Sequence, residues 1–355
     1  MALVASLVSP ILPAEANGPH AVIADLACGL GTRGHEVTVY AAAGSSLPGA
    51  GVRQVPVEPE ARGASVSFGR AAAPSSVAAL NRAYARLFAE LRHDEPDAVS
   101  QHAFDAAAID LAEGLPVLHT LHLPPMVDDV VAALRHSAAP RVTVSQAARL
   151  AWERAGVSPV GVLRNGVPVG DPSPGSVLPV ALVAGRISPE KGTDAAIRVA
   201  RRAGLAVLVA GDVYDDGYFT RAVEPMLRPG EWIGPVPRAE LFELMARSAV
   251  LLMPVCWDEA FGLVAAEAQM AGCPVVGYRR GALPEVVRHG IGGWLVEPDD
   301  EEALVAAVAC ARGLDRALIR ERARAELGVE RMVDDYERLL AEIAATPPDP
   351  PTMRR

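Results

Sequence analysis

The chain alternates between short strand-like runs and helical patterns along almost its whole length of 355 residues. Because parallel strands can be joined only by a crossover segment, usually a helix, this alternation predicts an α/β fold with parallel sheets covered on both faces. The expected strands are 2–8, 36–41, 97–100, 116–120, 141–144, 160–163, 180–184, 205–210, 231–233, 249–254, 274–277 and 293–296. The expected helices include 18–33, 75–92, 190–203, 238–247, 261–271 and 300–311.

A stretch dense in proline and glycine, VPVGDPSPGSVLP at 167–179, interrupts the alternation and is typical of a linker between domains. We therefore expect two Rossmann-like domains that face each other, one at about 1–168 and one at about 180–328. A last helical stretch at about 329–345 is expected to cross back to the first domain. The proline-rich end, 346–355, predicts a disordered tail.

The composition excludes some classes of function. The formal net charge is -10, so the chain lacks the basic balance of a nucleic-acid-binding surface. Half of the residues are apolar, which can supply a core for each domain. No stretch reaches about 18 uninterrupted apolar residues, so no membrane-spanning helix is expected. A local site for a small anion is compatible with this composition.

The first residues predict a buried strand rather than a secretory signal, because no basic residue precedes the apolar run and Pro10 and Pro13 interrupt it. The cysteines form no CxxC pair, so we expect reduced thiols in a cytoplasmic protein rather than disulfides or a zinc site. The four cysteines are Cys28, Cys256, Cys273 and Cys310.

One G-x-G-x-x-G pattern is present, with Gly29, Gly31 and Gly34 in CGLGTRG. A dinucleotide-binding fingerprint follows a strand and opens a helix. Here the glycines close the expected helix 18–33 and precede a strand, so the pattern predicts a helix end and a turn instead.

Two strand-to-helix turns are candidate phosphate sites, one after the first strand of each half. Gly18 in PAEANGPH lets an anion approach backbone N–H groups closely, although any such turn can carry a glycine. The second turn, AGRISPEKG at 184–192, contains Arg186 and Lys191, the only lysine in the chain. A guanidinium fork and a compact ammonium both suit phosphate oxygens, whereas a solvated basic turn is the alternative.

The segment DEAFGLVAAEAQMAGCPVVG at 258–277 follows an apolar strand. Glu259 lies in the turn, Phe261 and Gly262 open a helix, and Glu267 lies inside it. A helix N-terminus with glycine at its start can receive a diphosphate, and each carboxylate can accept hydrogen bonds from sugar hydroxyls. Because the run around Glu267 is apolar, its carboxylate needs a partner.

These residues match the E-x-F-G-x-x-x-x-E pattern of the family 4 retaining glycosyltransferases, which the chain resembles over nearly its whole length. The resemblance implies the two-domain GT-B fold, with a cleft between the domains. It departs from the family at Asn17, where the first glycine of a pair is common. Further segments that match in order are 17–41, RNGV at 164–167, 182–192, AVLVAGD at 206–212, WIGPV at 232–236 and 281–300.

The resemblance also implies roles for single residues. Arg186 and Lys191 would bind the donor diphosphate, where a fixed cationic pair stabilises the charge of the leaving group. Glu267 would hold the ribose, and Glu259 would orient the transferred sugar. The remaining donor-binding residues implied are Gly18, Phe261, Gly262 and Leu263.

His122 in VLHTLHLPP matches the histidine that the family places beside the donor sugar. His119 on the same segment and His102 in VSQHAFD are weaker candidates. A histidine near a strand end is otherwise more often structural.

The chain contains acidic pairs that could suggest a metal site, but none has the D-x-D spacing of such a site. No metal or other cofactor is therefore expected. These pairs are Asp128–Asp129, Asp215–Asp216 and Asp299–Asp300. The implied function is hexosyl transfer, with retention, from a nucleoside diphosphate sugar, UDP in preference to GDP. The sequence leaves the acceptor open between a small natural product, a lipid and a glycan, and it leaves open a peripheral membrane contact and the oligomeric state.

Two other classes remain as alternatives. A nucleotide-sugar epimerase of the same two-domain shape would need acid and base residues in the cleft. A non-catalytic two-lobed sugar-binding protein would need export.

Overall fold

The structure is a computed structural model that describes residues 1–12, 18–47, 49–64, 72–170 and 175–346. The described residues form two compact units. The first contains the described part of residues 1–164 together with 332–346, and the second contains the described part of residues 165–331. No helix among these described residues is long and apolar enough to cross a bilayer.

The first unit contains a seven-stranded parallel sheet in the order β3-β2-β1-β4-β5-β6-β7. The strands are β1 Ala2–Val4, β2 Thr38–Ala42, β3 Gly51–Val55, β4 Val99–Gln101, β5 Val117–Leu121, β6 Arg141–Thr143 and β7 Gly161–Val162. The helices and 3₁₀ turn are α1 Gly18–Thr32, η1 Pro59–Ala64, α2 Pro74–Asp94, α3 Ala106–Asp110, α4 Asp128–His136 and α5 Gln146–Arg154. The direction of strand order reverses between β1 and β4, which is where open α/β sheets bind ligands.

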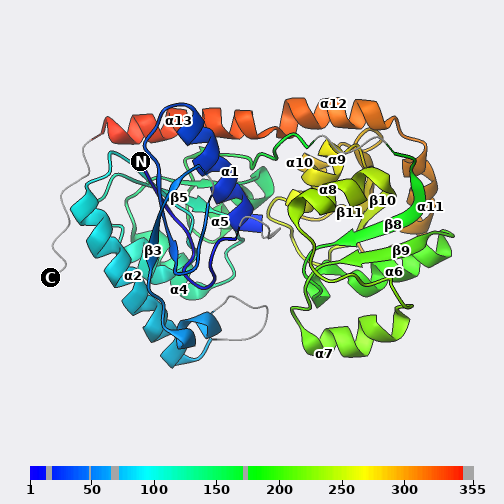
Figure 1. The fold of residues 1–355 in the computed structure, drawn as a ribbon, viewed down its shortest axis with the longest axis horizontal. Helices are drawn as coiled ribbons and strands as arrows, with labels where there is room; N and C mark the ends of the chain where they lie inside the picture. Colours follow the sequence, from blue (N-terminus) through cyan, green and yellow to red (C-terminus); the bar gives the residue numbers. More distant parts are fainter. Residues whose placement is uncertain (13–17, 48, 65–71, 171–174, 347–355) are drawn as a thin grey trace. The chain divides into compact units, whose positions relative to one another are not determined.

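The last helix, α13 Val329–Ala344, joins the first unit from Met332 onward and packs on α1 (Figure 1). A Cβ added to Gly29 of α1 would lie 2.4 Å from Val333 Cγ2, so only glycine allows this approach. Arg33 adds ion pairs to Asp334 at 2.7 Å and to Glu337 at 2.6 Å. The G-x-G-x-x-G glycines therefore serve helix packing and a helix end, since α1 stops at Thr32.

The second unit contains a five-stranded parallel sheet in the order β12-β11-β10-β8-β9, with the reversal between β8 and β10. Its strands are β8 Leu178–Ala184, β9 Ala206–Ala210, β10 Ser248–Met253, β11 Val275–Tyr278 and β12 Gly293–Val296. Its helices are α6 Thr193–Arg202, α7 Asp216–Tyr218, α8 Arg238–Arg247, α9 Leu263–Met270, α10 Leu283–Val286, α11 Glu301–Arg312 and α12 Arg316–Leu327. Its short irregular turns are η2 Pro189–Lys191, η3 Phe219–Val223 and η4 Glu224–Met226.

Three local features differ from the sequence expectations. The strand β3 was not expected, because its residues GVRQV are mostly polar or exposed at the sheet edge. The expected strand 231–233 is a single bridge from Trp232 to Val209, so it adds no strand to the sheet. The expected helix 190–203 is broken at Gly192, which has φ 66° and separates η2 from α6.

Candidate functional site

The candidate residues of the second unit follow β8 and β10, on either side of the reversal in strand order. Arg186 and Lys191 lie in the turn after β8, and Glu259 lies in the turn after β10. A Cβ on Gly192 would lie 2.2 Å from the Pro254 carbonyl oxygen, so this glycine lets the two turns pack together. Loops after the carboxyl ends of adjacent parallel strands meet at one edge, the usual ligand-binding edge of such sheets.

Lys191 and Glu259 are joined directly. Lys191 Nζ lies 2.6 Å from Glu259 Oε2, and the two side chains are 22% and 10% exposed. Trp257 Nε1 donates to the same carboxylate oxygen at 3.1 Å, and its ring centroid lies 5.0 Å from Lys191 Nζ. The ammonium is thus held by a carboxylate and an aromatic face, which removes much of its freedom.

Arg186 is positioned by two contacts of its own. Its guanidinium carbon lies 4.7 Å from the Tyr214 ring centroid, and Nη2 lies 3.8 Å from Glu190 Oε1. Glu190 is buried and accepts a 2.6 Å hydrogen bond from Ser188 Oγ. The Arg186 side chain is 42% exposed, so its fork remains open to a ligand.

The expected helix start after Glu259 is present. Gly262 has φ 91° and precedes α9, whose first residue is the half-buried Leu263, while Phe261 is buried. The backbone of Glu259 is fixed from the other side, because a Cβ on Gly281 would lie 2.4 Å from the Glu259 nitrogen and oxygen. The N-terminal N–H groups of α9 and the Glu259 carboxylate therefore have a rigid frame.

Glu267 has the partner that its burial requires. Arg238 Nε donates to Glu267 Oε1 at 2.8 Å, and the two side chains are 16% and 6% exposed. Arg238 opens α8 and also borders a cavity of about 300 Å³. The cavity is lined by Pro168, Val169, Gly170, Arg238, Ala239, Phe242 and Glu243.

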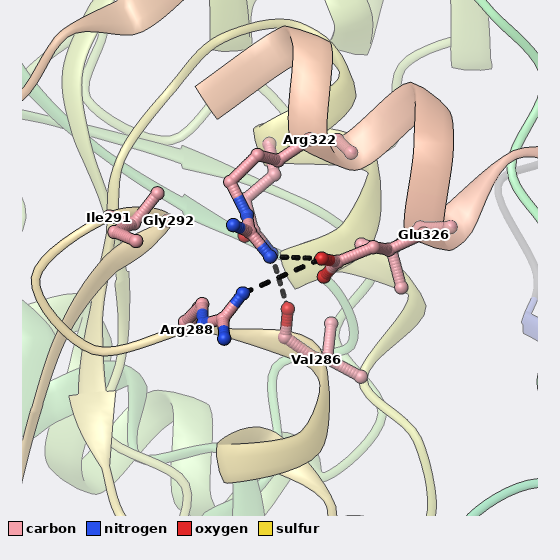
Figure 2. Close-up of a pocket in the computed structure, with 9 residues that line it drawn as sticks. Val286, Arg288, Ile291, Gly292, Arg322 and Glu326 are labelled. Atoms are coloured by element: carbon pink, nitrogen blue, oxygen red, sulfur yellow. Dashed lines mark hydrogen bonds and ion pairs between the residues drawn. The ribbon is translucent and has the colours of Figure 1, made fainter. Parts of the chain in front are cut away.

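A second cavity lies at the other end of α9, where Arg288 and Arg322 both pair with Glu326 (Figure 2). Its volume is about 10 Å³. That space holds about one water molecule, so this cavity is too small for a nucleotide or a sugar.

The histidine candidates lie in the first unit. His122 follows β5 and His102 follows β4, and His102 Nδ1 lies 2.8 Å from His122 Nε2. Burial lowers the pKa of His122 to about 4, and burial together with the neighbouring His122 ring holds the pKa of His102 well below its usual value. His119 lies within β5, and neither of its ring nitrogens has a partner among the described residues.

Gly18 is the first residue of α1, but most of the turn before it lies outside the described residues.

The acidic pairs have structural roles in the described residues. Asp215 and Asp300 accept backbone hydrogen bonds as the N-caps of α7 and α11, and Asp128 lies in the first turn of α4. No group of three His, Cys, Asp or Glu side chains among the described residues is arranged to hold a metal ion.

The sequence did not point to Trp257, Arg238 or Ser100. Trp257 carried a signal, because it stands two positions before Glu259 in the same turn. Arg238 lies 29 positions from Glu267, and Ser100, which bonds His102, is a small residue inside a strand. Pattern alone does not show such pairings.

Two family models match the chain. Residues 176–318 match the model described as glycosyl transferases group 1, and residues 16–170 match the model described as glycosyltransferase family 4. The chain is 33% identical over 147 residues to a D-inositol 3-phosphate glycosyltransferase of Streptomyces griseus, covering 36% of this chain and 30% of that protein. It spans about a third of the length of the first curated relatives that it matches.

The fold resembles two solved structures along nearly the whole chain. Anabaena HepE in complex with UDP-glucose superposes with a TM-score of 0.75 at 18% identity, covering 96% of this chain and 99% of that one. AviGT4, a glycosyltransferase involved in avilamycin A biosynthesis, superposes with a TM-score of 0.71 at 22% identity, covering 97% of each chain. Both likenesses support the GT-B arrangement of two parallel α/β sheets with a returning C-terminal helix.

Proposed function

Because the chain belongs to the glycosyl transferases of group 1, the family 4 enzymes, we propose that it transfers a sugar from a nucleoside diphosphate sugar to an acceptor. The transfer retains the anomeric configuration of the sugar. The acceptor is a small natural product, a lipid or a glycan, and the reaction takes place in the cytoplasm.

One observation carries this proposal, the pairing of Lys191 with Glu259 at 2.6 Å beside the start of α9. Lys191 would bind the diphosphate and Glu259 would bind the sugar. The two side chains are adjacent, as is needed for a ligand in which the sugar is bonded directly to the diphosphate. The ammonium is already held in place before a ligand binds, so the ligand does not have to order it.

The same geometry suits the chemical step. As the bond between sugar and diphosphate breaks, negative charge grows on the leaving diphosphate. Lys191 and Arg186 are positioned donors for that charge, and the free N–H groups at the start of α9 add to them. The Glu259 carboxylate accepts hydrogen bonds from sugar hydroxyls and so fixes the orientation of the sugar that is transferred.

Glu267 is proposed to hold the ribose. The cavity of about 300 Å³ that borders Arg238 would then take the base, since Phe242 and Pro168 offer apolar surfaces to a flat ring. UDP is proposed ahead of GDP. A structure of similar fold was solved with UDP-glucose, which makes that molecule the first donor to test.

The proposal is tested by incubating the chain with UDP-glucose and other nucleotide sugars without an acceptor. Slow release of UDP supports a transferase, because water can replace the acceptor. An isomerised nucleotide sugar would indicate an epimerase instead, and binding without any product would indicate a sugar-binding protein.

The reaction is expected to be independent of added metal, since Arg186 and Lys191 supply positive charge at the proposed diphosphate site. UDP release should persist in excess chelator. A loss of activity that Mg²⁺ or Mn²⁺ restores would contradict this assignment of the two side chains.

A further inference from the structure

A buried chain of hydrogen-bonding side chains lies at the carboxyl ends of β4 and β5. Ser100 Oγ lies 2.9 Å from His102 Nε2, and His102 Nδ1 lies 2.8 Å from His122 Nε2. The two imidazole rings stack, with centroids 5.1 Å apart. The exposed fractions of Ser100, His102 and His122 are 0%, 4% and 8%. The lowered pKa values of both histidines keep both rings neutral at pH 7.

A neutral imidazole has one N–H donor and one acceptor nitrogen. The three hydrogen-bonded side chains, Ser100, His102 and His122, can therefore share their protons in only two ways. In the first, Ser100 donates to His102 Nε2, His102 Nδ1–H donates to His122 Nε2, and the His122 proton lies on Nδ1. In the second, every bond runs in the opposite direction, and His122 Nδ1 carries no proton.

The hydroxyl of Ser100 decides between the two arrangements. Among the described residues its hydrogen-bond partner is His102, and the Ser100 side chain has no access to solvent. In the second arrangement Ser100 accepts from His102, so its own hydroxyl proton is buried without an acceptor. In the first arrangement the Ser100 proton has His102 Nε2 as its acceptor and the His102 proton has His122 Nε2, which leaves only the His122 Nδ1 proton for a partner outside these three side chains. An unmet buried donor is costly enough to favour the first arrangement by about tenfold or more.

We propose that Ser100 and His102 are positioning residues that hold His122 in the neutral tautomer protonated on Nδ1. His122 then meets a ligand as a hydrogen-bond donor, and it does not act as a general base at neutral pH. The identity of the ligand rests on the proposed function. The oxygen acceptors that such an N–H recognises are the hydroxyl and ring oxygens of a sugar.

The tautomer can be read directly by long-range ¹H–¹⁵N NMR of the full chain with ¹⁵N-labelled histidine at pH 7. The His122 signals are identified by their loss in His122→Gln. We expect Nδ1 to show the shift of a protonated nitrogen and Nε2 the shift of an acceptor. A His122 ring protonated on Nε2 in the unmodified chain would overturn the proposal.

The origin of the preference is tested with three variants. Ser100→Ala should populate both His122 tautomers, because neither arrangement then satisfies His102 Nε2, and Ser100→Thr should restore the single tautomer. Thr120→Val is the matched control, since it removes a buried hydroxyl that bonds Tyr336 at 3.1 Å outside the chain of donors. Thr120→Val should leave the His122 signals unchanged. An unaltered His122 tautomer in folded Ser100→Ala would also overturn the proposal, and the spectrum of the unmodified chain decides if that variant does not fold.

This measurement is independent of turnover, so it separates the inference from the proposed function. Added UDP-glucose should shift the His122 Nδ1–H signal if a sugar oxygen accepts its hydrogen bond. A correct tautomer without any sugar transfer would contradict the proposed function alone. A correct tautomer with turnover but no shift of the signal would contradict the sugar as the partner of Nδ1.

Discussion

At the scale of single residues, the contacts of Lys191 suit an ammonium better than the guanidinium that the chain uses at every other basic position. Lys191 Nζ fits between the Glu259 carboxylate at 2.6 Å and the Trp257 ring. A guanidinium is larger and presents its donors in a fixed plane. Because Gly192 presses this turn against Pro254, the turn has little freedom to move away from a larger group. We therefore expect this position to need the small size of an ammonium group as well as its positive charge.

Lys191→Arg should lower kcat/KM by at least about tenfold, or some 1.4 kcal/mol of transition-state stabilisation. Lys191→Ala should lose more, on the order of 10²–10³, because the charge itself is gone. Steady-state kinetics and the affinity for UDP measure both losses, while the melting temperature of Lys191→Arg should hardly change.

Arg202→Lys is the matched control for this pair of variants. Arg202 pairs with Glu302 on the surface of α6, so its replacement should leave kcat/KM unchanged. Normal rates for both Lys191 variants would mean that the only lysine has no part in the reaction.

Glu267 pairs with Arg238 and is proposed to hold the ribose, and a pair of variants can separate these two roles. Glu267→Gln should raise the KM for the donor more than it lowers kcat, because contacts with the ribose change little between ground and transition states. It should also lower the melting temperature, since the mostly buried Arg238 then loses the carboxylate at 2.8 Å that offsets its charge.

The double variant Arg238→Gln and Glu267→Gln removes both charges, so it should regain part of the melting temperature but not the KM. Donor titrations and thermal melts of the three proteins test this. A double variant with the original KM would mean that the carboxylate serves only to neutralise Arg238.

At the scale of elements, the sequence predicted the strand and helix order well because most strands of the two sheets are short runs rich in apolar residues, such as β8 and β10. It missed β3, whose edge position does not demand an apolar sequence, and it joined η2 to α6 across Gly192. For the candidate site, the sequence pointed to the motif residues Glu259 and Glu267 but not to the side chains that contact them, Trp257 and Arg238. Their roles depend on the distances between separate turns and helices, which no local pattern encodes.

The packing of α13 on α1 gives an element-scale prediction. Gly29→Ala should destabilise the first unit by about 1–3 kcal/mol, because the new methyl group overlaps Val333. An alanine inside a helix otherwise stabilises by about 0.4–1 kcal/mol. In a Val333→Ala background, where the space is open, Gly29→Ala should therefore be neutral or stabilising. Denaturant unfolding of the four proteins measures the coupling; equal costs in both backgrounds would show that the helices do not meet here.

At the scale of the whole molecule, the buried histidines are concentrated in the first unit. Burial lowers the pKa of His20, His119 and His122 to about 4, with nearby Arg141 adding to the effect at His119. In the unfolded chain these groups titrate near 6.5. The unfolded state therefore binds more protons between about pH 6.5 and pH 4, so stability falls as the pH drops through that range. Asp105 acts in the opposite direction, because burial raises its pKa to about 6.

These three histidines, together with His102, whose pKa burial also lowers, outnumber the one aspartate, so acid should lower the stability of the first unit before that of the second. Each proton taken up on unfolding is worth about 1.4 kcal/mol per pH unit. Hydrogen exchange read by mass spectrometry at pH 7 and pH 5, corrected for intrinsic rates, should show lost protection in β4 and β5 while β8 and β10 keep theirs. His119→Leu should reduce the loss, because it removes one buried titrating ring whose nitrogens have no partner among the described residues. Equal loss of protection in both sheets, or an unchanged loss in His119→Leu, would show that these buried histidines do not set the acid sensitivity.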